Sequence, residues 1–136
     1  MSDAIDRARL GALRRELGNS FMRILGYFRE DGVRSIDAIE DAVRQRSAVA
    51  LVRPAHTLKG EALQFGALPL GLMAEKIEMA ARRAVEDRVF PIDVIEYVVQ
   101  LRPLFEEALR VLTRETAAIS PIGRAMGFGR KIAAGF

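Results

Sequence analysis

The chain has 136 residues, of which 50% are hydrophobic and 29% charged, and these values are typical of one globular domain. The absence of cysteine excludes a disulfide framework and any cysteine-based metal site, and the single histidine cannot form a histidine-rich metal site. The formal net charge is +3, but the basic residues are scattered among the acidic ones. This distribution fits a protein that docks on an acidic partner as well as it fits a nucleic-acid binder.

An apolar stripe with helical spacing begins near the N-terminus. Its members recur every three or four residues and are Leu10, Leu13, Leu17, Phe21, Ile24 and Phe28. We expect residues 18–20, Gly-Asn-Ser, to divide this stretch into two helices, and Asp31-Gly32 to end it. The next predicted helix has Ile36, Ile39 and Val43 on one side and stops near Ser47.

Three proline residues mark the following helices. We expect a helix from about Ser47 to Phe65, although Pro54 inside it would remove a hydrogen bond, so the alternative is a regular helix that starts close to Pro54. The next helix is predicted from about Pro69 to Glu86. Phe90-Pro91 is expected to open the last helix, since proline suits a first turn. The apolar stripe of this last helix is Val94, Ile95, Val98, Leu101, Phe105, Ala108 and Leu112.

The helical pattern decays after Thr116. Residues 119–136 are rich in glycine and basic side chains, and we interpret them as a flexible tail that follows a bundle of residues 1–118. The sequence therefore predicts an all-α fold, an antiparallel four-helix bundle with an extra N-terminal helical segment and a flexible C-terminal tail. We expect a monomer, because the apolar stripes can cover one another within one bundle.

Neither a membrane span nor an export signal is predicted. No run of about 18 apolar residues occurs in the chain. The first residues lack the apolar core of a signal peptide. We therefore expect a soluble, cytoplasmic protein that does not bind membranes.

His56 is the candidate for chemistry. On a helical wheel of about 100° per residue, Lys59 and Gly60 flank His56, while the apolar stripe of this helix lies opposite, so the imidazole should point out of the bundle. A neutral imidazole nitrogen attacks phosphorus readily, Lys59 can neutralise an attached phosphoryl group, and Gly60 leaves space for a partner. An exposed histidine is most often an ordinary surface residue. Glycine inside a helix costs about 1 kcal/mol relative to alanine, however, which argues for a function.

The segment His56-Thr57-Leu58-Lys59-Gly60, with Gly66 ten residues after the histidine, resembles the HxLKG…G signature of histidine-containing phosphotransfer (HPt) domains. The resemblance covers about Phe21 to Leu112. It implies a helical bundle in which a surface histidine shuttles phosphoryl groups between receiver-domain aspartates. In that family a polar residue 22 positions after the histidine orients the imidazole through Nδ1, and this position is Glu78 here.

The helical wheels add detail around this motif. Glu78 falls at the margin of the buried face of its helix, where it can reach a neighbouring helix, fix the imidazole tautomer and leave Nε2 as the nucleophile. Arg82 can pair with Glu78, either as an ordinary surface ion pair or, as the resemblance implies, near the phosphoryl group. Leu63 lies on the His56 face and either packs against a neighbouring helix or belongs to an apolar docking surface. We favour the docking surface. Glu61, where the family often has a small residue, points away from His56.

The predicted function is that of a phosphocarrier without kinase activity in a multistep His–Asp phosphorelay. The resemblance implies receiver domains of response regulators as partners, with a hybrid histidine kinase as a further candidate. We expect no cofactor and no metal ion in this chain, because the metal ion belongs to the receiver, and no nucleic-acid partner. Two alternatives are a basic helical regulator that binds nucleic acid and an adaptor that binds receiver domains without being phosphorylated.

Overall fold

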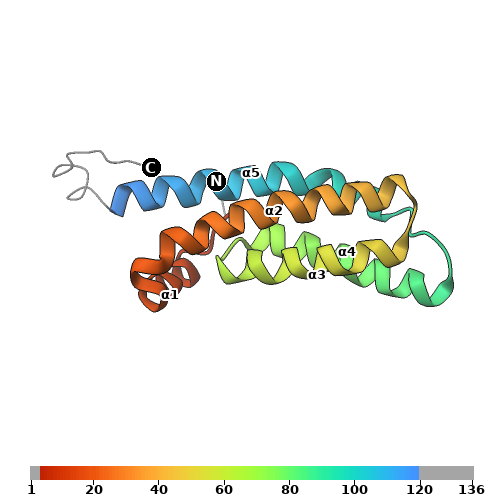
Figure 1. Ribbon diagram of the computed structural model, residues 1–136, viewed down its shortest axis with the longest axis horizontal. Coiled ribbons are helices and arrows are strands. Elements are labelled where there is room, and N and C mark those ends of the chain that lie inside the picture. Colours follow the sequence, from red (N-terminus) through yellow and green to blue (C-terminus); the bar gives the residue numbers. More distant parts are fainter. Residues whose placement is uncertain (1–3, 120–136) are drawn as a thin grey trace.

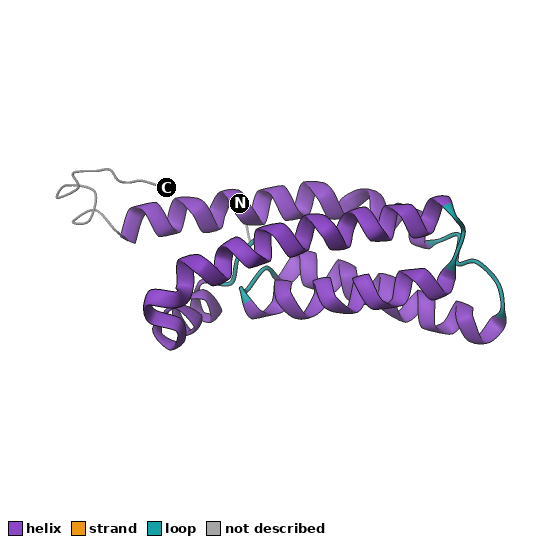
Figure 2. Cartoon of the chain, viewed as in Figure 1, coloured by secondary structure: helices purple, strands orange, loops and turns teal. Residues whose placement is uncertain are grey.

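The protein is a bundle of long helices, and the computed structural model describes residues 4–119 (Figures 1 and 2). The helices are α1 (Arg7–Leu17), α2 (Phe21–Arg44), α3 (Ala48–Gln64), α4 (Leu68–Asp87) and α5 (Val94–Ile119), with a 3₁₀ turn at Gly18–Ser20. Helices α2 to α5 form the antiparallel four-helix bundle, and α1 folds against one end of it (Figure 1). The predicted all-α architecture is confirmed. The predicted tail lies outside the described residues except for Ile119, the last residue of α5.

Local capping explains the separate α1. Asp6 begins the helix, because its Oδ1 accepts hydrogen bonds from the backbone N–H groups of Ala8 and Arg9 at 3.0 and 3.3 Å. Gly18 ends it with a φ of +53°, so the predicted break between residues 17 and 21 is confirmed. The backbone N–H of Asp6 then donates to the carbonyl of Gly66 at 2.7 Å, which anchors α1 to the turn between α3 and α4.

Gly66, the second glycine of the motif, is required by this anchor. Its φ is +79°, in the left-handed region that favours glycine. A Cβ atom at this position would also lie 2.8 Å from the carbonyl oxygen of Asp6. Any other residue would therefore disturb the contact between α1 and the α3–α4 turn.

The prediction that Asp31-Gly32 ends a helix is wrong, because α2 runs without interruption from Phe21 to Arg44. Gly32 is buried, and a Cβ atom there would lie 2.3 Å from Cε1 of Phe105 on α5. This glycine therefore makes room for an aromatic ring within the helix. The predicted separate helix with Ile36 and Ile39 is the second half of α2, and it ends at Arg44, before Ser47.

The proline predictions have mixed outcomes. Pro54 lies inside α3, which begins at Ala48 after the N-cap Ser47, so a start close to Pro54 is wrong. Pro91 does not open α5. Its carbonyl instead accepts a hydrogen bond from the backbone N–H of Val94 at 2.9 Å, in the turn before the helix begins. Ile95 is exposed, unlike the other members of the predicted α5 stripe, all of which are buried.

The core is continuous from one end of the bundle to the other. Its aromatic members are in contact, with ring centroids 5.9 Å apart for Phe21 and Phe65, 4.9 Å for Phe28 and Phe65, and 5.6 Å for Phe28 and Phe105. On the surface, Arg102 of α5 connects to α2 through ion pairs with Asp37 and Glu40 at 2.9 and 2.8 Å. These two carboxylates raise the pKa of Arg102 above its usual value. None of the described helices is both long and apolar enough to cross a membrane.

Candidate functional site

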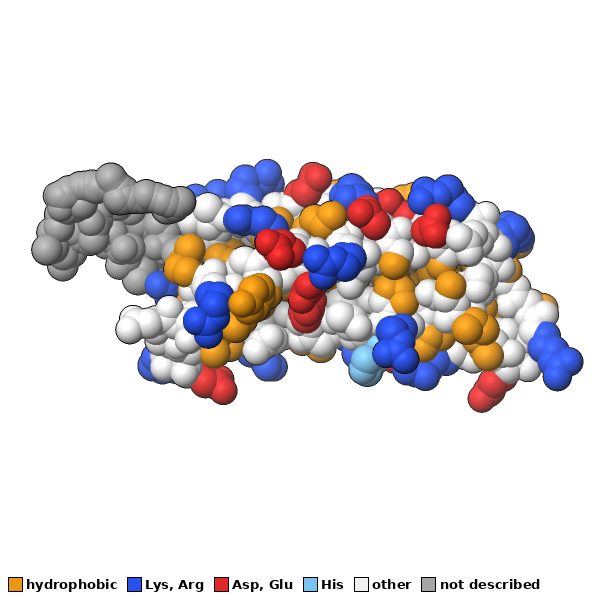
Figure 3. Space-filling model, viewed as in Figure 1, with side chains coloured by type: hydrophobic (Ala, Val, Ile, Leu, Met, Phe, Trp, Pro, Cys, Tyr) orange, Lys and Arg blue, Asp and Glu red, His pale blue; other side chains and the backbone are white. Residues whose placement is uncertain are grey.

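His56 lies on the outer face of α3. The buried residues of this helix are Leu51, Ala55, Leu58 and Ala62, which face the core on the opposite side. The His56 side chain is 60% exposed. Figure 3 shows the pale-blue histidine at the surface beside basic side chains. The predicted outward direction of the imidazole is confirmed.

Glu78 of α4 holds one nitrogen of this imidazole. The residue is only 4% exposed, and its Oε2 lies 2.9 Å from Nδ1 of His56. A carboxylate can only accept hydrogen bonds, so Nδ1 carries the proton and donates it. The other nitrogen, Nε2, then has a free lone pair. The structure therefore brings together the two residues that the sequence placed 22 positions apart.

Two cations share the Glu78 carboxylate with His56. Nζ of Lys59 forms an ion pair with Oε1 at 2.9 Å, and Arg82 approaches Oε2 with Nε at 2.9 Å and a terminal nitrogen at 2.8 Å. Burial by itself would raise the pKa of Glu78, but the hydrogen bonds from Lys59, Arg82 and His56 outweigh it and lower the pKa to about 2. Glu78 is therefore a permanent anion at neutral pH.

The two cations differ in their freedom to leave Glu78. The Lys59 side chain is 24% exposed, whereas the Arg82 side chain is 58% exposed. Water solvates the exposed part of the Arg82 guanidinium, which lowers the cost of moving this side chain to another anion. Arg82 is therefore the cation that can exchange Glu78 for an arriving anion at low cost.

The two remaining residues of the predicted site behave differently. Gly60 is exposed, and a Cβ atom there would meet no described atom within 4 Å, so packing does not require glycine at this position. Leu63 is half-buried. A Cβ atom placed on Gly71 of α4 would be only 2.5 Å from Cδ2 of Leu63. This contact favours the interpretation that Leu63 packs against α4 over its assignment to a docking surface.

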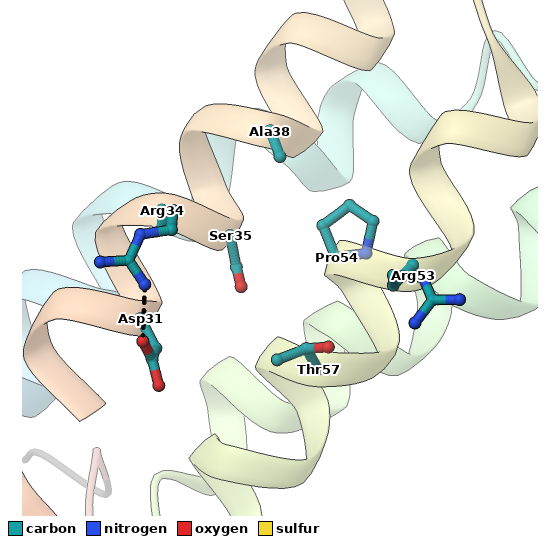
Figure 4. Close-up of a pocket in the computed structure, with 7 residues that line it drawn as sticks. All are labelled: Asp31, Arg34, Ser35, Ala38, Arg53, Pro54 and Thr57. Carbon is teal, nitrogen blue, oxygen red and sulfur yellow. Dashed lines mark hydrogen bonds and ion pairs between the residues drawn. The ribbon is translucent and has the colours of Figure 1, made fainter. Parts of the chain in front are cut away.

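A groove of about 400 Å³ runs along the other flank of α3. Figure 4 shows its two sides, which are Asp31, Arg34, Ser35 and Ala38 on α2 and Arg53, Pro54 and Thr57 on α3. This groove could not be predicted from the sequence, because the register of α2 against α3 cannot be read from periodicity alone. Thr57, which lines the groove, follows His56 directly in the chain.

Comparison with known proteins identifies the family. A family model described as the Hpt domain matches residues 23–115, more than half of the chain. The chain belongs to the Hpt domain family. Its fold is similar to the crystal structure of histidine-containing phosphotransfer protein B (HptB) from Pseudomonas aeruginosa PAO1, with a TM-score of 0.74, 22% sequence identity, and coverage of 85% of this chain and 96% of that chain. No curated protein sequence matches this chain significantly.

Membership in this family gives the general function. Hpt domains serve histidine phosphotransfer in phosphorelays, as carriers of phosphoryl groups rather than as enzymes. The family match begins within α2, so α1 is an addition to the matched region.

Proposed function

We propose that His56 is the phosphoryl acceptor and that this chain relays phosphoryl groups between aspartates of receiver domains. The observation that carries this proposal is an exposed imidazole whose Nδ1–H donates to a buried carboxylate at 2.9 Å. This bond selects the tautomer in which Nε2 is the nucleophile. It also holds the ring in one orientation, with Nε2 available to a partner.

The transfer step follows from this geometry. The lone pair of Nε2 attacks the phosphorus of a receiver phospho-aspartate, the N–P bond forms, and the P–O bond to aspartate breaks with its electron pair leaving on the carboxylate. Nδ1 keeps its proton, so the phosphorylated ring is a cation that Glu78 stabilises across 2.9 Å. Transfer onto a second receiver is the reverse of this step. The metal ion that assists the reaction belongs to the receiver, and this chain supplies no cofactor.

The two cations have separate roles in this proposal. Lys59, the less exposed of the two, remains against Oε1 of Glu78 and contributes positive charge at the base of the site. Arg82 leaves Oε2 and pairs with the phosphoryl oxygens, since guanidinium binds phosphate well. Gly60 allows the receiver backbone to approach α3 closely.

The receivers are those of response regulators, or of a hybrid histidine kinase. Active pockets of receivers are rich in carboxylates. Arg82 pairs with the carboxylate that holds His56, and Arg53 lies three residues before His56 on α3. The expected charge complementarity steers the encounter and is sensitive to salt.

Chemical and protein phosphorylation together test the proposal. The protein is incubated with phosphoramidate, and separately with a panel of receiver domains charged with labelled acetyl phosphate. We expect label in the wild-type chain that is lost in acid and stable in alkali, as is typical of phosphohistidine. His56→Gln should take up none. Label retained by His56→Gln, or absent from the wild type with both donors, would refute the proposal. Binding of receivers without labelling would instead support the adaptor.

A further inference from the structure

The groove between α2 and α3 exists because the side chains that face each other across it are short. Ser35 and Ala38 of α2 lie opposite Pro54 of α3 (Figure 4). None of these three side chains is long enough to fill the gap, and a volume of about 400 Å³ is left open. Ser35 is buried, Pro54 is half-buried and Ala38 is exposed. The groove is therefore an open and largely apolar depression in the surface.

The charged side chains that line this groove are unequally paired. Arg34 forms an ion pair with Asp31, one helical turn away on α2, at 2.9 Å. Arg53, on the α3 side, extends away from both of them (Figure 4). No carboxylate among residues 4–119 forms an ion pair with the Arg53 guanidinium. The Asp31 charge is thus neutralised within α2, and Arg53 leaves one uncompensated positive charge at the rim of the groove.

Arg53 lies on the same face of α3 as His56. On a helix of about 100° per residue, Arg53 and Thr57 stand about 60° and 100° from His56 in the same direction, the direction of the groove. Lys59, which faces α4, stands about 60° from His56 in the other direction. Val49, one helical turn before Arg53, is 70% exposed on this face. A protein that reaches the imidazole along α3 therefore also meets Arg53 and the apolar surface beside it.

The chemistry of this surface fits a protein partner that presents one apolar and one acidic side chain. A guanidinium binds a carboxylate through two parallel hydrogen bonds. The groove removes an apolar side chain of the partner from water. A nucleic acid fits less well, because its phosphates require a row of cations, whereas the groove offers one unpaired cation and also contains the carboxylate of Asp31.

We propose that the α2–α3 groove and Arg53 select the receiver domain that docks on this chain. An apolar side chain of the receiver enters the groove, and a neighbouring carboxylate of the receiver pairs with Arg53. The inference rests on the proposed function in one respect, namely that the protein reaching His56 is a receiver. A receiver with a basic side chain at the same place meets a like charge and binds more weakly, so Arg53 discriminates among receivers.

Equilibrium binding of receivers tests the role of Arg53 without requiring phosphoryl transfer. Isothermal titration calorimetry is performed on the full chain with a panel of response-regulator receiver domains. For the receivers that bind, Arg53→Gln should raise Kd about fivefold at low salt and less than about twofold at about 0.5 M salt, because the lost contact is between charges. The matched control is Arg83→Gln, which removes the same charge from an exposed position between α4 and α5 and should change Kd less than about twofold.

A second substitution, Ala38→Gln, tests the groove itself. The longer polar side chain occupies the space meant for the receiver, so Kd should rise about tenfold. Thr113→Gln is the control, since it places the same side chain at an exposed position in a separate groove between α2 and α5 and should leave Kd unchanged.

Four results would overturn the proposal. They are a Kd unaffected by Arg53→Gln, a Kd unaffected by Ala38→Gln, equal losses in Arg53→Gln and Arg83→Gln, and the absence of binding by any receiver. Receivers that bind the wild type through this groove without labelling it would instead refute the phosphocarrier role and leave the docking site in place. Labelling of His56 by phosphoramidate in a chain that binds no receiver would refute the docking site alone.

Discussion

Replacing Glu78 by glutamine isolates the charge at the centre of the site. Glutamine has nearly the same shape, and its amide oxygen still accepts the hydrogen bond from Nδ1 of His56. The substitution removes the negative charge that holds Lys59 and Arg82. Because the amide nitrogen then faces Nζ of Lys59, a loss of stability measures the charge together with the acceptor that Lys59 loses, and the packing is nearly unchanged.

The magnitude follows from the pKa of Glu78. A decrease from 4.5 to about 2 favours the ionised form in the folded protein by about 3 kcal/mol, at about 1.4 kcal/mol per pKa unit. Glu78 is 4% exposed, so solvent screening does not reduce this value much. Since the folded pKa is depressed, the stabilisation is present above pH 4.5 and is lost as the pH falls towards 2. Glu78→Gln should therefore cost about 3 kcal/mol at pH 7 and about 1.5 kcal/mol at pH 3.

Urea unfolding of the wild type and Glu78→Gln at these two pH values measures the prediction. Glu86→Gln, at an exposed position on α4, is the control and should change the free energy of unfolding by less than about 0.5 kcal/mol at pH 7. Equal destabilisation by Glu78→Gln at pH 7 and pH 3 would refute the electrostatic reasoning. A loss below about 1 kcal/mol at pH 7 would also refute it.

Three further substitutions test individual features. Gly60→Ala should raise the free energy of unfolding by about 0.5–1 kcal/mol, because alanine is the better helix former. The same variant should be labelled more slowly by a receiver. A stabilised variant with wild-type labelling would show that the receiver does not approach this residue. Gly32→Ala should cost about 1–3 kcal/mol in denaturant unfolding, because the new methyl group overlaps the Phe105 ring, and wild-type stability would contradict that contact. Arg102→Ala should cost about 1 kcal/mol at low salt and less at 1 M salt, and a cost independent of salt would point to lost packing.

The helical fold could be predicted because the core stripes repeat at helical spacing, but individual helix ends could not. Gly32 after an aspartate has the composition of a helix end, yet its function is to admit the ring of Phe105, a residue far along the chain. Pro54 does not break α3. Proline lacks the backbone N–H that would donate to the carbonyl of Ala50. Ala50 is exposed, so water can donate a hydrogen bond to this carbonyl instead. Both outcomes depend on tertiary surroundings that local sequence does not encode.

The centre of the site was predictable because its members lie at fixed spacings on two adjacent helices. The helical wheel predicted that His56 faces outwards, and it placed Glu78 at the margin of the buried face of its helix, within reach of the neighbouring helix. The contact of Lys59 with the same carboxylate depends on the position of α3 along the axis of α4, which cannot be read from periodicity. For the same reason, helical periodicity could not show which residues of α2 lie near Glu61.

The two carboxyl groups beside α3 have opposite dependences on pH. Glu78 is surrounded by cations, and its contribution to stability is lost only in acid, as the pH falls from 4.5 towards about 2. Glu61 meets another carboxyl group, and its effect becomes unfavourable as the pH rises from 4.5 to about 7. The same side-chain chemistry thus gives two carboxyl groups whose pKa values are shifted in opposite directions, because the neighbours differ in charge. The orientation of His56 by Glu78 should therefore be insensitive to pH near neutrality.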